Sequence, residues 1–328
     1  MTSLPRLAIV VPCYNEEEVL PFTIHELTEA LQNLIDSGLV ASDSKIVLVD
    51  DGSVDSTWAI IKKFVTEDSA PVIGLAFSRN FGHGAALFAG LSYAREHFDI
   101  AITMDADLQD DISKLPEFIT AYNNGAQVVY GVRSDRSSDS FFKRFFAESF
   151  YRFMSALGVK QVPNHAEYRL MSKTVLNELQ HYPERNLYLR GIIASMGFAH
   201  AEVPYARNRR AAGQTKYSFF GPLKLALEAI TSFSVAPLRF ISLTGMFWVL
   251  ITIGFAVYAI ASKLLGVATP GWTATVLIIS LLGGVQITFM GIIGEYVGKI
   301  YQEVKGRPRY IIEQIIGEKH TDSTRQSR

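Results

Sequence analysis

Two long stretches without a charged residue constrain the fold of this chain more than any other feature. They run from Phe240 to Ser262 and from Thr273 to Gly294. Each can cross the hydrocarbon core of a bilayer as a helix, which takes about 20 residues. Helices buried in a soluble core are the alternative. We expect a hairpin of two transmembrane helices near the end of the chain.

Basic residues flank this predicted hairpin unevenly. Lys263 lies between the two stretches, whereas the basic residues outside them are Arg239, Lys299, Lys305, Arg307 and Arg309. Lysine and arginine collect on the cytoplasmic side of a membrane. The pattern therefore predicts a multi-pass protein of the inner (plasma) membrane, with the residues before the first stretch and both termini in the cytoplasm.

The first half of the chain alternates apolar runs with amphipathic stretches. The runs Leu7–Val11, Ile46–Val49, Val72–Phe77, Ile100–Met104 and Val128–Val132 have the length of buried strands, and the stretches 17–35, 56–65, 85–96 and 112–123 between them have helical periodicity. This alternation predicts an α/β fold with a mostly parallel sheet covered on both faces. Ligands of such sheets bind at the carboxyl ends of the strands.

Composition excludes some classes of protein. The formal net charge of the 328 residues is -1, so the balance of charge gives no reason to expect nucleic acid as a partner. The single cysteine, Cys13, lies in an apolar run, so no disulfide can form within the chain and a reducing compartment is permitted. We interpret Cys13 as part of the core.

Polar clusters follow the first four predicted strands. They are Asn15-Glu16, Asp50-Asp51, Ser78-Arg79-Asn80 and Asp105-Ala106-Asp107. Two carboxylates one residue apart at the end of a buried strand can bind a divalent cation, and a nucleotide diphosphate is a natural bridging ligand for that cation. The sequence therefore predicts a nucleotide-sugar enzyme, with its site at one edge of the sheet.

These motifs resemble those of a known family. The segments are 11–16 (VPCYNE), 49–57 (VDDGSVDST), 78–82 (SRNFG) and 105–110 (DADLQD). They are similar to the family 2 glycosyltransferases of the GT-A fold, and within them to the polyprenyl-phosphate glycosyltransferases of the GtrB and dolichol-phosphate mannose synthase type. The likeness extends to the basic cluster at 207–217, the two apolar stretches and the segment 306–308. It covers almost the whole chain.

The resemblance implies roles for individual residues. Asp107 and Gln109 would be direct ligands of Mg²⁺ or Mn²⁺, and Asp105 would contact the nucleotide or the metal through water. The nucleotide sugar would meet Pro12, Tyr14, Glu16, Val49, Asp51, Arg79, Asp105, Ala106 and Arg133. We interpret Asp55 as a helix cap, and Asp110 as either a site residue or part of a helix N-terminus.

A second set of basic residues follows the predicted sheet. Guanidinium groups pair bidentately with phosphate oxygens, and the expected reaction has a donor diphosphate and an acceptor phosphate to hold. We predict that the acceptor phosphate is bound by Arg144, Arg207, Arg210 and Lys216. The predicted catalytic residues are Asp105, Asp107, Glu167, Arg207, Arg210 and Lys216. Solvated side chains, or contacts with anionic lipid, are the alternative for Arg136 and Arg209.

The chain departs from the family pattern at two places. His83 and Gly84 stand where the family usually has a lysine and an acidic residue, which puts the role of that lysine in doubt. Glu167 stands where the family typically has an aspartate. A phosphate monoester is already largely ionised at pH 7, since its second pKa is about 6, so we assign Glu167 to orientation, with base catalysis as a further hypothesis.

The domain organisation follows from these features. We expect a cytoplasmic GT-A domain at 1–215, an interfacial amphipathic helix at 216–238, the transmembrane hairpin at 239–296 and a cytoplasmic tail at 297–328. The aromatic and basic stretch 141–154 is a second candidate for the membrane surface; packing within the soluble domain is its alternative.

The expected function is inverting, metal-dependent transfer of a hexose from a nucleotide diphosphate sugar to a polyprenyl phosphate, with glucose, UDP-glucose and undecaprenyl phosphate favoured through the resemblance. The product would be a sugar donor for cell-envelope glycosylation. The alternatives are another lipid or polysaccharide acceptor, and a non-enzymatic membrane scaffold with a degenerate transferase domain. Small residues in the second stretch, such as Gly283, Gly284 and Gly291, are compatible with a homo-oligomer.

Overall fold

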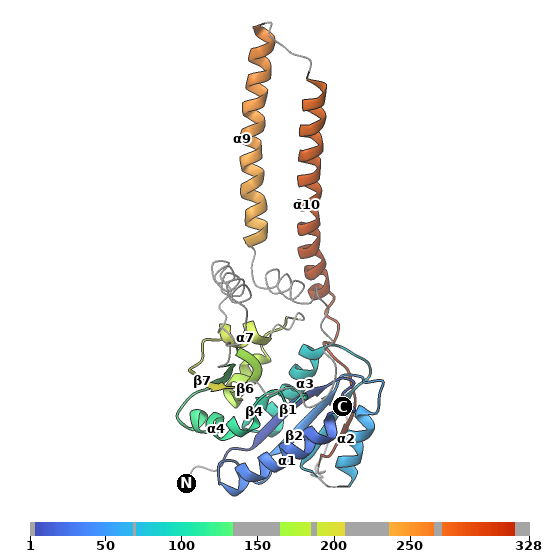
Figure 1. The fold of residues 1–328 in the computed structure, drawn as a ribbon, viewed down its shortest axis with the longest axis vertical. Helices are drawn as coiled ribbons and strands as arrows, with labels where there is room; N and C mark the ends of the chain where they lie inside the picture. The colour runs from blue at the N-terminus through green and yellow to red at the C-terminus, as the bar shows by residue number, and fades with distance from the viewer. Residues whose placement is uncertain are drawn as a thin grey trace, which may run out of the picture. The chain divides into compact units, whose positions relative to one another are not determined.

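The computed structural model of the protein describes residues 4–67, 70–133, 165–184, 189–206, 236–265 and 271–318. These residues fall into two compact units. One contains the sheet and its helices together with the segment that starts at Arg307, and the other contains two long helices. Figure 1 shows both units.

The described residues form an eight-stranded sheet in the order β7-β5-β6-β4-β1-β2-β3-β8. The strands are β1 (Leu7–Cys13), β2 (Lys45–Asp50), β3 (Val72–Phe77), β4 (Ile100–Thr103), β5 (Val128–Arg133), β6 (His165–Ser172), β7 (His200–Tyr205) and β8 (Ile312–Ile316). Strands β4, β1, β2 and β3 run parallel, whereas β6 and β8 run antiparallel to their neighbours. The five predicted strands are present, and the mostly parallel α/β sheet is confirmed.

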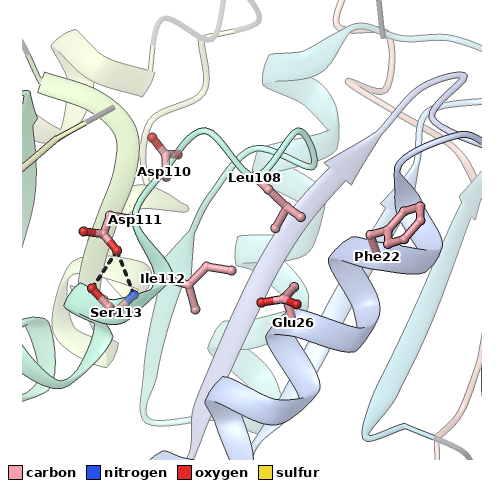
Figure 2. Close-up of a pocket in the computed structure, with 7 residues that line it drawn as sticks. All are labelled: Phe22, Glu26, Leu108, Asp110, Asp111, Ile112 and Ser113. Atoms are coloured by element: carbon pink, nitrogen blue, oxygen red, sulfur yellow. Dashed lines mark hydrogen bonds between the residues drawn. The ribbon is translucent and has the colours of Figure 1, made fainter. Parts of the chain in front are cut away.

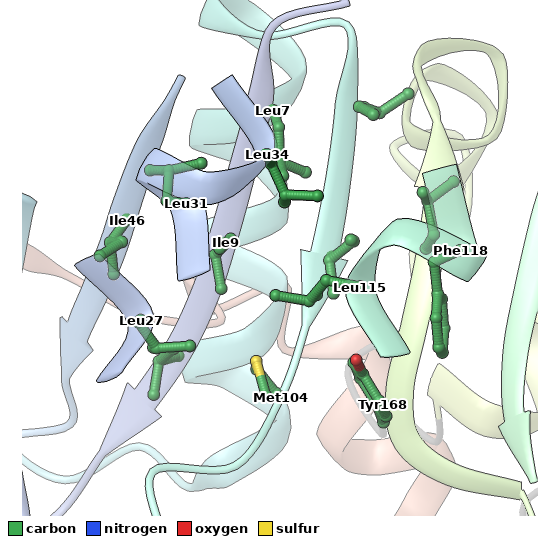
Figure 3. Packing of buried hydrophobic residues seen from close by; sticks show 14 of the residues in the cluster. Leu7, Ile9, Leu27, Leu31, Leu34, Ile46, Met104, Leu115, Phe118 and Tyr168 are labelled. Carbon is green, nitrogen blue, oxygen red and sulfur yellow. The ribbon is translucent and has the colours of Figure 1, made fainter. Parts of the chain in front are cut away.

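Helices cover both faces of the sheet. They are α1 (Leu20–Asp36), α2 (Thr57–Thr66), α3 (His83–His97), a 3-10 turn η1 (Ile112–Lys114) with α4 (Leu115–Asn123), α6 (Lys173–Leu179) and α7 (Leu189–Ser195). One face carries the apolar stripe of α1, including Leu27, Leu31 and Leu34, which packs with Leu115 and Phe118 of α4 (Figure 3). This burial of aliphatic and aromatic side chains stabilises the layered fold.

Helix α3 packs on the opposite face of the sheet at close range. A Cβ atom at Gly90 would lie 2.3 Å from Cγ1 of Val10 and 3.0 Å from Cγ2 of Val49. A glycine at this position therefore allows the helix to approach β1 and β2. Cys13, at the end of β1, is 1% exposed, which confirms its place in the core.

The second unit contains α9 (Ala236–Leu264) and α10 (Trp272–Val304). The two predicted transmembrane stretches lie within these helices. Within the part of the chain that the structure describes, the segment Leu281–Val304 of α10 is long and apolar enough to cross a membrane, with a mean hydropathy of 1.3. The structure does not confirm the first span, so the two-helix transmembrane hairpin and the multi-pass arrangement stay predictions.

The chain returns to the sheet after α10. Strand β8 pairs antiparallel with β3, with Gly74 opposite Ile316 and Ala76 opposite Gln314. The residues of β8 belong to the predicted tail 297–328, in which no strand had been predicted. The stretch 141–154 and residues 216–235 of the predicted interfacial helix 216–238 lie outside the described residues, as does the tail after residue 318, while residues 236–238 belong to α9.

Candidate functional site

Loops from the carboxyl ends of β1 and β2 are joined by hydrogen bonds. The backbone N–H of Asn15 donates to Oγ of Ser53 at 3.0 Å, and that of Val54 donates to Oδ1 of Asn15 at 2.9 Å. The N–H of Glu16 donates to Oγ1 of Thr57 at 2.9 Å. These contacts hold the segment with Tyr14 and Glu16 beside the end of β2, as the sequence predicted for a shared edge.

Asp51 is buried and supports the loop that follows β3. Its Oδ1 accepts the N–H of Phe81 at 2.7 Å, and its Oδ2 accepts that of Gly82 at 2.9 Å. Burial raises the pKa of Asp51, and these two donors oppose the rise. The carboxylate that we predicted to contact the nucleotide thus also fixes the backbone beside Arg79.

Gly52 permits the close contact between the loops after β2 and β3. Its φ is +65°, and a Cβ atom there would lie 2.3 Å from the carbonyl carbon of Arg79. Only glycine fits both the left-handed conformation and the contact. Asp55 accepts the N–H of Thr57 at 3.0 Å and that of Glu17 at 3.2 Å, so it acts as a cap, as predicted.

The loop after β4 presents the two predicted metal ligands on one turn. Oδ1 of Asp107 accepts the N–H of Gln109 at 3.2 Å, and the intervening Leu108 has a φ of +55°. The carbonyl of Ala106 accepts the hydroxyl of Thr23 in α1 at 2.6 Å. The hydrogen bond from Thr23 therefore fixes the backbone of this loop against α1, and the carboxylates of the loop lie at the end of β4.

Four carboxylates gather around this loop. Burial raises the pKa of Asp105, and the charges of Asp110, Glu167 and Asp107 raise it further, while His83 opposes them. Nε2 of His83, at the start of α3, lies 3.8 Å from Oδ1 of Asp105. A cation bound beside Asp105 would offset its repulsion by the neighbouring carboxylates.

Asp110 is the most buried member of this cluster. The residue is 2% exposed, and Oδ1 accepts a hydrogen bond from the hydroxyl of Tyr205 at 2.6 Å. Nε of Arg133 donates to the same hydroxyl at 3.3 Å. Among the residues that the structure describes, Oδ2 of Asp110 is buried and has no hydrogen-bond partner, and burial raises the pKa of this carboxyl. Asp110 is thus linked to Arg133, which the sequence analysis assigned to the nucleotide.

Glu167 is paired with two arginines. Its Oε2 accepts Nη2 of Arg169, and its Oε1 accepts Nε of Arg190, each at 2.5 Å. Burial would raise the pKa of Glu167, but the two guanidinium groups outweigh burial and hold the pKa at about 2. An ionised carboxylate that is fully engaged in this way is suited to orienting groups and poorly suited to taking a proton.

A pocket of about 490 Å³ lies beside the loop Asp105–Asp110 that follows β4, which we call the acidic loop (Figure 2). Phe22 and Glu26 of α1 line one side of it, and the residues from Leu108 to Ser113 without Gln109 line the other. Apart from Leu108 and Asp110, it shares no residue with the site described above. Ser113 donates to Asp111 from its N–H and its hydroxyl, so Asp111 caps the 3-10 turn.

A divalent cation fits the donor set of this site. The carboxylate of Asp107, the amide oxygen of Gln109 and the unpartnered Oδ2 of the buried Asp110 are hard oxygen donors near one loop. Across the ranges that the structure describes, no group of three or more His, Cys, Asp or Glu side chains is arranged to hold a metal ion. A cation here would need oxygens from a ligand such as a diphosphate.

The remaining predicted residues are placed as follows. Pro12 and Val49 are register partners in the sheet, and Val49 is fully buried, so neither its side chain nor its backbone is exposed in this structure. Tyr14 and Arg79 are exposed. The basic residues assigned to the acceptor phosphate, Arg144, Arg207, Arg210 and Lys216, lie outside the described residues.

Three contributors to the site were not expected from the sequence. They are Arg190, which pairs with Glu167, Tyr205, which bonds to Asp110, and Thr23, which anchors the acidic loop. Each lies far along the chain from its partner and in no recognisable motif. Only their partners carried a signal in the sequence, since Asp110 lies in the DADLQD run and Glu167 and Arg133 were predicted as site residues.

Comparison with known proteins identifies the family of the chain. Residues 8–180 match Glycosyl transferase family 2. The chain is 50% identical over 311 residues to the uncharacterized glycosyltransferase YkoT of Bacillus subtilis, covering 95% of this chain and 92% of that protein. It is 39% identical over 313 residues to the SfII prophage-derived bactoprenol glucosyl transferase of Shigella flexneri, covering 94% and 97%.

Among solved structures, the mannosyltransferase PcManGT of Pyrobaculum calidifontis, in complex with GDP-Man and Mn²⁺, is 19% identical, with a TM-score of 0.42 over 93% of this chain and 88% of that chain. The chain belongs to glycosyl transferase family 2 and is a glycosyltransferase, and its relatives support the polyprenyl-phosphate branch of that family.

Proposed function

We propose that the protein transfers glucose from UDP-glucose to undecaprenyl phosphate at the cytoplasmic face of the membrane, with inversion at the anomeric carbon. The observation that carries the proposal is the 39% identity, over almost the full length of both chains, to a bactoprenol glucosyl transferase. The acidic loop after β4 and its neighbouring loops supply the chemistry that such a transfer needs. The product would donate its sugar to the cell envelope.

The donor nucleotide would lie across the carboxyl ends of β1 to β4. Tyr14, Glu16 and Arg79 stand on loops that the hydrogen bonds of Asn15 and Asp51 hold in place. Arg133, joined to Asp110 through Tyr205, provides a further positive charge beside the acidic loop. We assign the binding of the nucleotide to Tyr14, Glu16 and Arg79, and the binding of one end of the diphosphate to Arg133.

The transfer itself is a displacement. An oxygen of the acceptor phosphate attacks the anomeric carbon, the bond from that carbon to the nucleotide diphosphate breaks, and the electron pair leaves with the diphosphate. A phosphate monoester is largely ionised at pH 7, so no side chain must remove a proton. This fits an ionised, doubly paired Glu167, which we assign to orienting the reactants.

A divalent cation bound by Asp107 and Gln109 would supply charge neutralisation for the diphosphate. Mg²⁺ and Mn²⁺ both suit carboxylate and amide oxygens. We assign the acceptor phosphate to Arg144, Arg207, Arg210 and Lys216, because bidentate guanidinium groups and an ammonium match its oxygens.

A lipid acceptor requires that the protein contact a bilayer, and α9 and α10 are the candidate elements for this contact. Their large apolar side chains are exposed in the structure, as Phe240, Leu250, Ile287 and Met290 illustrate with 61 to 72% exposure. Apolar surface of this extent is stable in lipid rather than in water. We propose that both helices span the membrane and that both chain ends are cytoplasmic.

The test is transfer of radiolabel from a panel of UDP- and GDP-sugars into undecaprenyl phosphate by the purified full-length protein with Mg²⁺ or Mn²⁺. We expect labelled lipid from UDP-glucose, lost with a chelator and in Asp107→Ala. Label from another donor would change the sugar. Nucleotide binding without labelled lipid would point to another acceptor, and absence of metal-dependent nucleotide binding would support the scaffold alternative.

A further inference from the structure

The segment after α10 forms a strap along the edge of the sheet, from Arg309 to Glu318. Strand β8 lies within it and pairs with β3. The N–H of Ser78 donates to the carbonyl of Ile311 at 3.1 Å, which extends the contact to the first residue after β3. The strap therefore borders the loop Ser78–Gly82, in which Arg79 stands.

Tyr310 in the strap begins a line of stacked side chains. Its ring lies parallel to that of Phe77, with centroids 5.2 Å apart and planes at 6°. Phe77 meets Phe81 edge-on, with centroids 5.7 Å apart. The guanidinium of Arg79 lies 3.9 Å from the centroid of the Phe81 ring. Each of these geometries is a favourable aromatic or cation-π arrangement.

Two further contacts fix the strap on both sides of Tyr310. The guanidinium of Arg309 lies 4.4 Å from the centroid of Phe88 in α3, and it donates to the carbonyl of Tyr182. At the other end, the carboxylate of Glu318 accepts the hydroxyl of Tyr93 at 2.9 Å. The contacts of Arg309 and Glu318 thus fix the strap on both sides of Tyr310, so the ring of Tyr310 is held in place against Phe77.

We propose that Tyr310 is a positioning residue for the nucleotide sugar. Through Phe77 and Phe81 it holds Arg79 and the Ser78–Gly82 loop in the arrangement that receives the donor. The inference rests on the proposed function, because Arg79 is assigned to the nucleotide there. Asp51 holds the backbone of the same loop at Phe81. The strap stabilises the side chains of that loop, through the contact of Tyr310 with Phe77 and of Phe77 with Phe81.

The substitution that tests this is Tyr310→Ala in the full-length protein. We expect the Kd for UDP with Mn²⁺ and the KM for the nucleotide sugar to rise about three- to tenfold, the range of one lost aromatic contact, with kcat within about twofold. Hydrogen exchange of residues 78–82 should become faster. Tyr310→Phe keeps the ring and should restore both readouts.

Two controls separate positioning from general damage. Glu313→Gln changes an exposed side chain on β8 and should alter neither nucleotide binding nor exchange at 78–82. Tyr310→Leu keeps apolar volume without a flat face, and it provides the measurement if the alanine variant does not fold. Unchanged UDP binding in a folded Tyr310 variant that lacks the ring would overturn the proposal. Failure of the wild-type protein to bind any nucleotide sugar would instead overturn the proposed function.

Discussion

Replacing Glu167 with glutamine should destabilise the sheet unit strongly. The side chain of Arg169 is 1% exposed and faces Glu167, so the substitution leaves a buried guanidinium without the carboxylate that balances it. The pKa of Glu167 is held at about 2 against an ordinary value of 4.5. At 1.36 kcal/mol per pKa unit, this shift corresponds to about 3 kcal/mol. Breaking a buried ion pair typically costs a similar amount.

The expected loss can be read as a melting temperature. For a domain of this size, 1 kcal/mol shifts the melting temperature by about 2–4 °C, so Glu167→Gln should melt about 6–12 °C below the wild type at pH 7. The measurement is thermal unfolding of the purified protein in detergent. Glu202→Gln, the same change at an exposed position on β7, is the matched control and should leave the melting temperature within about 1 °C.

The pH dependence gives an independent check. A carboxyl whose pKa is lower in the folded state stabilises the fold fully above its unfolded pKa, and this contribution is lost as pH falls through the folded pKa. The difference between wild type and Glu167→Gln should therefore shrink as the pH falls from about 4.5 towards 2. A difference below about 2 °C at pH 7, or one that stays constant with pH, would refute this reasoning.

Three further outcomes are expected. Gly52→Ala should lower the melting temperature and weaken UDP binding, since its Cβ would lie 2.3 Å from the neighbouring loop. Gly38→Ala is the control, because Gly38 has a φ of +64° and open space around it, and this change should cost only about 1 kcal/mol of stability. Equal effects of the two substitutions would contradict this reasoning. Tyr205→Phe removes the donor to the buried Asp110, which should cost about 1–3 kcal/mol in thermal unfolding. Gln109→Ala should raise the Mn²⁺ concentration for half-maximal transfer about tenfold or more, and an unchanged requirement would exclude it as a ligand.

The first five strands and their helices could be predicted because their signals are local. Each strand is a short apolar run bounded by turn residues, and the observed ends differ from the predicted ones by at most two residues, as at Leu7–Cys13. The polar clusters were predicted to meet because the carboxyl ends of parallel strands share an edge. The observed contacts among Asn15, Ser53, Asp51 and Phe81 agree with that reasoning.

The strands beyond residue 160 were not predicted, for a physical reason. Strand β6 runs antiparallel between β4 and β5, and β8 pairs with β3 from the other end of the chain. No local pattern encodes such long-range pairing. Likewise, the resemblance pointed to Glu167 as a site residue, but only one of its two arginines, Arg169, lies beside it on β6, whereas Arg190 comes from α7. Partner identity is set by tertiary packing.

The position of β8 has a consequence for how the protein is made. A chain leaves the ribosome from its N-terminus, so β3 presents an open hydrogen-bonding edge until the residues that follow α10 have been synthesised. Tyr93 meets its partner Glu318 only after 225 further residues. Exposed strand edges promote association with other chains. Truncation anywhere before Ile312 should therefore yield a protein that self-associates during biogenesis, and we expect the nascent sheet to depend on chaperones until its last strand arrives.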